Sequence, residues 1–201
     1  MTDEAEPFSP NIWPADPVPP FAAECERCEL SRQRRRIIWG EGAAGAPILA
    51  LLDNPGARED AQGDPFVCGT RQTLQRAVHE AGLLLQDVYV TYALKCRPIR
   101  AYDKPLSRLA CSGHLEAQLL KSQPQYVLCL GTAAAQVWFS DETAQVKTLR
   151  GTWHSIRGIP TAVTYHPLAV RRRPNLWRFF LEDWKRIAQR YHASPVCGVP
   201  E

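Results

Sequence analysis

The sequence lacks the features that would assign it to a membrane, repeat or disordered class. No apolar run approaches the roughly 20 residues that a membrane-crossing helix requires. The N-terminus has no positively charged stretch followed by an apolar one, so we expect a cytoplasmic protein that binds no membrane. Internal repeats and low-complexity tracts are absent, and a hydrophobic content of 45% excludes wholesale disorder.

What is present suffices for one domain with a full core, because the chain has 201 residues. Residues 1–22 are rich in proline and have little apolar periodicity, so we expect an extended or poorly ordered arm there. We expect residues 23–192 to form the folded domain and residues 193–201 to form a tail. No feature of the sequence demands more than a monomer.

Charge is unevenly distributed along the chain. Acidic residues exceed basic ones within residues 1–30, and the remainder carries the excess of positive charge. Basic residues gather in clusters at residues 32–36, 97–108 and 171–178. Such a field attracts polyanions, and nucleic acid is the commonest of them. Solvated arginine-rich faces are the alternative interpretation of each cluster.

Apolar runs alternate with amphipathic patterns beyond the arm. The patterns predict strands at residues 48–52, 87–94, 126–130 and 161–165, and helices at residues 70–81, 107–120, 133–139 and 175–191. Strands that alternate with helices indicate the α/β class. We therefore predict a three-layer α/β/α sandwich with a central, mostly parallel, four-stranded sheet.

Polar or turn-forming residues follow every predicted strand. They are Asp53-Asn54-Pro55-Gly56, Lys95-Cys96-Arg97-Pro98, Gly131-Thr132 and His166-Pro167. Ligands of open α/β sheets bind outside the carboxyl ends of the strands, so the four turns together predict a site at one edge of the sheet. Any one of them alone would indicate only a turn.

The seven cysteines favour metal or cluster ligation over disulfides, because we expect a reducing compartment. Cys25 and Cys28 form a C-x-x-C pair, whereas Cys96 and Cys111 are more widely separated. Four thiolates can hold a zinc ion or an iron–sulfur cluster, and the spacing alone leaves both open, as it does the absence of either. Cys129 lies inside a predicted buried strand and is better explained as a small apolar residue.

The ordered set of motifs resembles the iron–sulfur uracil-DNA glycosylases, which form family 4 of the uracil-DNA glycosylase superfamily. The matching elements extend over residues 25–187. They are Cys25-x-x-Cys28, Gly40-Glu41-Gly42, Pro55-Gly56 with Glu59-Asp60, Gly63-x-Pro65-Phe66-Val67, Thr91-x-x-x-Lys95-Cys96-Arg97-Pro98, Cys111, Leu130-Gly131, Leu149-Arg150-Gly151 and Thr164-Tyr165-His166-Pro167.

The resemblance implies a role for each of these groups. It implies that Cys25, Cys28, Cys96 and Cys111 ligate a structural four-iron four-sulfur (4Fe-4S) cluster. It also implies that Phe66 stacks on a base flipped out of DNA and that His166 hydrogen-bonds the carbonyl oxygen of that base. The stretch 168–173 would enter the DNA, and its arginines would contact phosphates. These arginines are Arg171, Arg172 and Arg173.

The sequence departs from the family at two positions of the expected site. Where the family has Gly-Glu-Ala-Pro-Gly, this chain has Leu-Asp-Asn-Pro-Gly, so Asn54 is the first candidate for orienting the attacking water and Asp53 the second. An Asx-Pro-Gly turn is the structural alternative. The family's Asn that reads the uracil edge is replaced by Tyr92, and one phenol cannot copy both contacts of an amide.

The resemblance therefore predicts a monofunctional DNA repair glycosylase, with DNA that contains a deaminated base as its partner and uracil as the first base to consider. A glycosylase for another base, such as hypoxanthine, is an alternative. A catalytically weak or inactive DNA-binding member of the superfamily is a second alternative, which the substitution at Tyr92 favours. A nucleotide-binding α/β protein unrelated to repair would leave the four cysteines unexplained.

Overall fold

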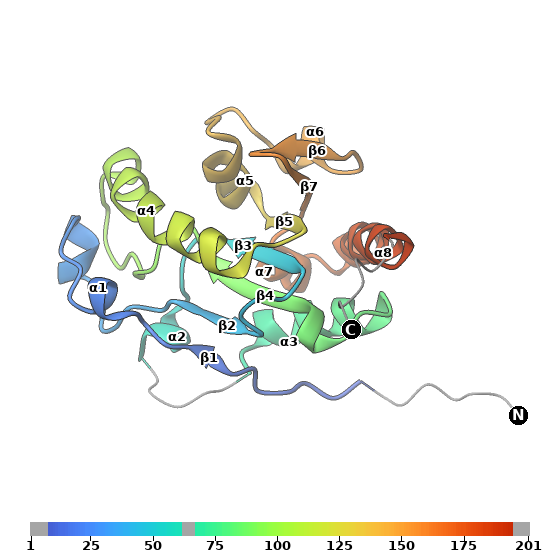
Figure 1. Cartoon of the computed structure of the whole chain (residues 1–201), viewed down its shortest axis with the longest axis horizontal. Helices are drawn as coiled ribbons and strands as arrows, with labels where there is room; N and C mark the ends of the chain where they lie inside the picture. The colour runs from blue at the N-terminus through green and yellow to red at the C-terminus, as the bar shows by residue number, and fades with distance from the viewer. Residues whose placement is uncertain (1–7, 62–66, 195–201) are drawn as a thin grey trace, which may run out of the picture.

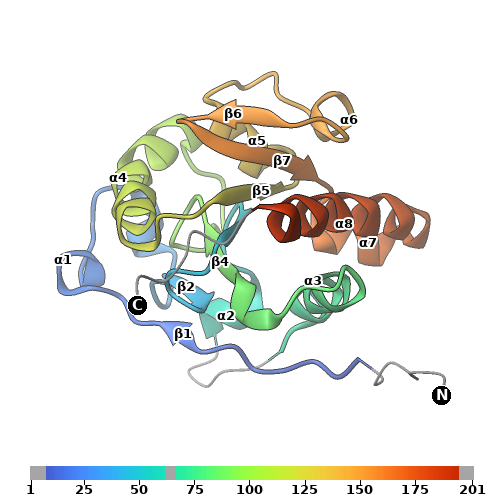
Figure 2. The same cartoon turned by 45° about the vertical axis from the view of Figure 1, so that its right-hand side comes forward.

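A seven-stranded sheet with helices on both faces forms the centre of the molecule (Figures 1 and 2). The computed structural model describes residues 8–61 and 67–194. In spatial order the strands are β1 (Ala15–Asp16), β2 (Gly40–Gly42), β4 (Val88–Tyr92), β3 (Ile48–Leu52), β5 (Tyr126–Leu130), β7 (Ile159–Thr164) and β6 (His154–Ile156).

The four central strands β4, β3, β5 and β7 are parallel, which confirms the predicted α/β/α sandwich. The predicted number of four strands was wrong, because β1 and β2 extend one edge in antiparallel pairing and β6 extends the other. These edge strands have two or three residues each. Segments of that length are too short to show the alternation that identifies a strand in sequence.

The helices lie before, between and after the parallel strands along the chain. They are α1 (Pro20–Ala23), α2 (Ala57–Ala61), α3 (Gly69–Glu80), α4 (Lys104–Ser122), α5 (Thr132–Phe139), α6 (Val146–Leu149), α7 (Pro167–Arg172) and α8 (Trp177–Ala193). Short 3-10 turns are η1 (Glu29–Arg32), η2 (Leu85–Asp87) and η3 (Pro174–Leu176). No helix among the described residues is long and apolar enough to span a membrane.

Alternate residues of the central strands point into two apolar cores. On one face, α3, α7 and α8 pack over the sheet, with Leu74, Phe180 and Trp184 fully buried. On the other face, α4 and α5 contribute Leu115 and Trp138. Figure 2 shows α3, α7 and α8 together on one side of the strands and α4 on the opposite side. Both faces of the sheet are covered, which explains why its central strands are continuous apolar runs.

The described part of the arm expected at residues 1–22 packs against the domain and ends in helix α1. Trp13 is buried in the core that contains α3. The backbone N–H and carbonyl of Asn11 bond the Gln75 side chain at 2.9 and 2.6 Å. Ala15 and Asp16 then add β1 to the sheet edge. These contacts explain how a proline-rich segment without apolar periodicity acquires a fixed path.

Candidate functional site

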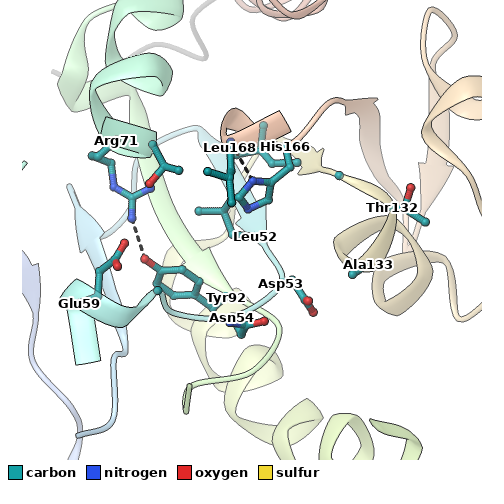
Figure 3. A pocket seen from close by; sticks show the side chains of 14 residues that line it. Leu52, Asp53, Asn54, Glu59, Arg71, Tyr92, Thr132, Ala133, His166 and Leu168 are labelled. Atoms are coloured by element: carbon teal, nitrogen blue, oxygen red, sulfur yellow. Dashed lines mark hydrogen bonds between the residues drawn. The ribbon is translucent and has the colours of Figure 1, made fainter. Parts of the chain in front are cut away.

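A cavity of about 390 Å³ opens at the carboxyl ends of the parallel strands. The turns after β3, β5 and β7 contribute to its lining, and β4 contributes its last residue, Tyr92. Figure 3 shows side chains from these different elements converging on one space. The lining residues include Leu52, Asp53, Asn54, Glu59, Arg71, Tyr92, Gly131, Thr132, His166 and Leu168. This is the edge of the sheet at which the sequence places a site.

His166 enters the cavity as a neutral hydrogen-bond donor. It is the N-cap of α7, and its Nδ1 accepts a hydrogen bond from the backbone N–H of Leu168 at 3.0 Å. That bond requires Nδ1 to be unprotonated, so the neutral ring carries its proton on Nε2. Burial, with a smaller contribution from the nearby Arg71 charge, lowers the pKa of His166 to about 4.

Gly131 makes room for His166 on the wall formed by β5 and β7. Gly131 has φ near +100°, and a Cβ at this position would lie 2.9 Å from the Cβ of His166. A larger residue would therefore be strained and would also collide with the histidine. The glycine of the Leu130-Gly131 sequence thus allows the His166 ring to occupy its place in the cavity.

Asn54 and Asp53 lie on the opposite turn, after β3. The Nδ2 of Asn54 donates to the carbonyl oxygen of Pro55 at 2.8 Å, which fixes the amide and leaves Oδ1 able to accept. Asp53 lines the same cavity, and burial raises the pKa of its carboxyl group, opposed by the charges of Arg108 and Lys104. The turn interpretation of this sequence and a role in the cavity are thus compatible.

Tyr92 is buried and is held by a charged network that the sequence analysis did not identify. The Nη2 of Arg71 donates to the Tyr92 phenol oxygen at 2.7 Å, and the Nε of Arg71 forms an ion pair with Glu41. Burial opposes the charge of Arg71, but Tyr92, Glu41 and Glu59 favour it, so the pKa of the guanidinium is raised. Burial also raises the pKa of Tyr92, which keeps the phenol protonated.

Arg71 could have been found from its position in the sequence. It lies three residues before Leu74 and seven before Val78, both of which face the core from α3. An arginine on the apolar face of a predicted helix requires buried partners. The spacing indicates the burial, but only the folded chain brings Tyr92 and Glu41 to the guanidinium.

The four cysteines of the expected ligand set line a separate, small cavity. Cys25 and Cys28 lie between α1 and η1, Cys96 lies after β4, and Cys111 lies in α4. Cys96 and Cys111 are buried together with Leu30 and Leu94, and Cys28 packs against this cluster. Three distant segments of the chain therefore bring thiols to one place.

Two side chains lie within hydrogen-bond distance of the thiol sulfur atoms, and burial raises the pKa of Cys96 to about 11, opposed by the charge of Arg34. The Nη1 of Arg34 donates to the Sγ of Cys96 at 3.4 Å, and the Nε2 of His114 lies 3.2 Å from the Sγ of Cys25. Among the described residues, no three His, Cys, Asp or Glu side chains are close enough to hold a single metal ion. A four-iron cluster binds each cysteine to a different iron, so it does not require the sulfurs to meet at one ion.

The three arginines of the expected DNA contact lie outside these two cavities. Arg171, Arg172 and Arg173 are exposed at the end of α7, which begins directly after His166. In the first basic cluster, by contrast, the Nε of Arg36 donates to the backbone carbonyl of Asp60. Phe66 lies outside the described residues.

Comparisons with known proteins identify the family of this chain. The family model of the uracil DNA glycosylase superfamily matches residues 39–188. The chain is 31% identical to the type-4 uracil-DNA glycosylase of Saccharolobus solfataricus, over 86% of this chain and 84% of the relative. It is also 31% identical to the type-4 enzymes of Archaeoglobus fulgidus, over 87% and 88%, and of Thermotoga maritima, over 80% and 85%. The chain belongs to the uracil DNA glycosylase superfamily.

Proposed function

We propose that this protein is a DNA glycosylase that hydrolyses the N-glycosidic bond of a deaminated base, with uracil as the first substrate. The single observation that supports this most is the cavity in which neutral His166 and Asn54 lie on facing walls at the carboxyl ends of parallel strands. Membership of the superfamily and the activity named for its type-4 relatives support the same reaction. Residues 23–192 would form the catalytic domain of a monomer.

The reaction requires a stabilised leaving group. When the bond between base and deoxyribose breaks, positive charge develops on the sugar and negative charge on the departing base. The Nε2–H of His166 would donate to the base carbonyl oxygen as that charge develops. Because this histidine is neutral at ordinary pH and its ring is oriented by the Leu168 N–H, it would stabilise the anion by donating from Nε2–H and would transfer no proton.

The reaction also requires an oriented water molecule. The amide of Asn54 is fixed by its bond to Pro55, so Oδ1 can accept a hydrogen bond from a water that attacks the sugar. Asp53, as second candidate, would supply a carboxylate next to the same turn and favour the positive charge on the sugar. Asn54 is the better candidate because the positive charges of Arg108 and Lys104 offset the negative charge of the Asp53 carboxylate.

The base must leave the DNA stack to enter a cavity of this kind. We propose that Phe66 stacks on the flipped base and that Tyr92 contacts its edge. Arg171, Arg172 and Arg173 would contact phosphates, because exposed guanidinium groups beside the cavity can position a DNA strand without reading its sequence.

We further propose that Cys25, Cys28, Cys96 and Cys111 hold a 4Fe-4S cluster. The four thiols line one cavity, and Arg34 and His114 offer hydrogen bonds to two of their sulfur atoms. The cluster would act as a structural cross-link between the N-terminal segment, the chain after β4 and helix α4. No step of base release requires it.

The direct test is base release from a short single-stranded DNA that contains one uracil, detected by alkaline cleavage at the abasic site. Release at a rate that depends on Asn54 and His166 supports the proposal. A folded, brown protein that releases no uracil would instead favour hypoxanthine or xanthine as the base, and these are assayed next. Failure with all three bases would support the non-catalytic, DNA-binding alternative, for which Tyr92 is the specific observation.

A further inference from the structure

The Tyr92 hydroxyl accepts one hydrogen bond and retains a hydrogen that it can donate. Its oxygen accepts from the Nη2 of Arg71 at 2.7 Å. Within the described part of the chain, no acceptor receives the hydroxyl hydrogen. A phenol can donate one hydrogen bond, and a buried one normally does so. Tyr92 lines the cavity, so a ligand in the cavity can receive this hydrogen.

Arg71 fixes the direction of this hydrogen bond. The guanidinium is buried and is held by Glu41, so it presents a permanent positive charge to the phenol oxygen. A second N–H donor that approached the same oxygen would meet this charge, whereas a carbonyl oxygen that approaches the O–H is favoured by it. Tyr92 therefore presents a donor, not an acceptor, to the cavity.

An acceptor lies on the same wall. Glu59 lines the cavity and is close enough to Arg71 and Tyr92 to raise the pKa of both. Figure 3 shows its carboxylate beside the phenol end of Tyr92 and below Arg71. One oxygen accepts weakly from the Cys68 thiol at 3.5 Å, and the carboxylate keeps further lone pairs for a ligand N–H.

This donor and acceptor match the chemical change that deamination makes. Deamination replaces an exocyclic amino group by a carbonyl oxygen and adds a hydrogen to the neighbouring ring nitrogen. Uracil and hypoxanthine therefore share an O=C–N–H edge, which xanthine, thymine and guanine also carry. Cytosine and adenine present an amino group and a bare nitrogen at the same positions, which would set donor against donor and acceptor against acceptor.

We propose that Tyr92, oriented by Arg71, and Glu59 form a specificity pair that reads the carbonyl and the adjacent N–H of a deaminated base. The pair would distinguish uracil from cytosine and hypoxanthine from adenine, so it would not restrict the enzyme to uracil. Thymine and guanine, which carry the same edge, would have to be excluded by other parts of the cavity. This inference rests on the proposed glycosylase function and adds the class of base and the residues that select it.

The first test is Tyr92→Phe, which removes the hydroxyl and retains the ring. Single-turnover release of uracil and of hypoxanthine from single-stranded DNA is expected to fall roughly 10- to 100-fold for both bases. Tyr89→Phe is the matched control. Tyr89 lies on the same strand, and its hydroxyl bonds Asp16 and Gln118 outside the cavity. The Tyr89→Phe variant should have a lower melting temperature and should release both bases at the wild-type rate.

The second test is Glu59→Ala, which alters a half-buried side chain and should fold even if Tyr92→Phe does not. The wild type is expected to release uracil at least about tenfold faster than 3-methyluracil, which lacks the ring N–H. Glu59→Ala should reduce this ratio to near one. A structural role alone would lower both rates and leave the ratio unchanged.

The outcomes separate this inference from the proposed function. If the wild type releases uracil and both variants keep its rate and its selectivity, the inference is wrong and the glycosylase function remains. If the wild type releases no base, the glycosylase function fails, and binding to DNA with one uracil or one cytosine decides the inference. A preference for uracil that Tyr92→Phe removes supports it, and equal binding overturns it.

Discussion

The cavity at the strand ends and the cysteine cavity differ in where their chemistry comes from. In the cysteine cavity, the thiol is the functional group whatever surrounds it, and folding only brings four of them together. In the cavity at the strand ends, the neighbours decide the chemistry. His166 is neutral because it is buried beside Arg71, and Tyr92 is a donor because Arg71 occupies its oxygen. Sequence motifs therefore predict the first site more completely than the second.

The two cavities are nevertheless linked through the end of β4. Lys95 is buried between Tyr92, which lines one cavity, and Cys96, which lines the other. Its Nζ donates to the carbonyl oxygen of Tyr92 at 2.6 Å and to the Thr91 hydroxyl at 2.8 Å. Loss of a cysteine that displaces the backbone near Cys96 is thus expected to affect the cavity at the strand ends. Removal of Asn54 or His166 changes no residue of this link, so it should leave the cysteines in place.

The largest expected effect comes from breaking the cysteine cavity. Cys96→Ser should remove iron, abolish the brown colour and lower the free energy of unfolding by more than about 3 kcal/mol. Iron content and denaturant unfolding measure the two effects. Cys129→Ser is the control, because Cys129 is fully buried in β5 away from the ligand set. It should cost about 1–3 kcal/mol for an unsatisfied hydroxyl and retain its iron. Iron retained by the Cys96 variant would contradict the ligand assignment.

Substitutions in the cavity at the strand ends should lower the rate of base release without loss of iron. Asn54→Ala and His166→Ala are each expected to slow uracil release by about 100- to 1,000-fold, because each removes a preorganised polar contact in the reaction. Iron content should not change. Single-turnover assays measure the rates, and absorbance of the cluster provides the control. Near-normal rates in both variants would eliminate the proposed roles of these residues.

The pH dependence tests the claim that neighbours set the chemistry of His166. With a pKa near 4, the ring stays neutral when pH falls from 8 to 5, so the rate of base release should be nearly constant over that interval. An ordinary histidine would instead give a change near pH 6.5. The free energy of unfolding should fall as pH is lowered from 6.5 to about 4, because His166 binds a proton in the unfolded chain but not in the folded one. A rate change centred near pH 6.5 that is lost in His166→Ala would contradict this assignment.

The smallest effect is expected at the arginines outside both cavities. Arg172→Ala should weaken DNA binding about equally for all sequences and reduce the slope of log affinity against log salt by about 1. Fluorescence anisotropy at several salt concentrations measures this slope. Lys121→Ala is a suitable control, since Lys121 is exposed and pairs with Asp16 near the β1 edge of the sheet. An equal change in both variants would indicate a general charge effect.

Much of the fold could be predicted because its central strands are buried on both faces. The runs at 48–52 and 126–130 match β3 and β5 residue for residue, and the helix expected at 70–81 is α3 with its bounds shifted by one residue. The edge strands were missed because their pairing partners, not their own side chains, determine them. Gly40–Gly42 becomes β2 only because β4 lies beside it.

By itself, the sequence determined the α/β class, the cysteines that share a cavity and the turns that gather at the strand ends. Apolar runs, thiols and turn residues carry these properties in their own side chains. The tertiary structure alone decided the ionisation of His166, the burial of Arg71 against Tyr92 and Glu41, and the nearness of Glu59 to both. Desolvation and charge–charge interactions depend on which groups meet in space, and those groups come from segments far apart along the chain.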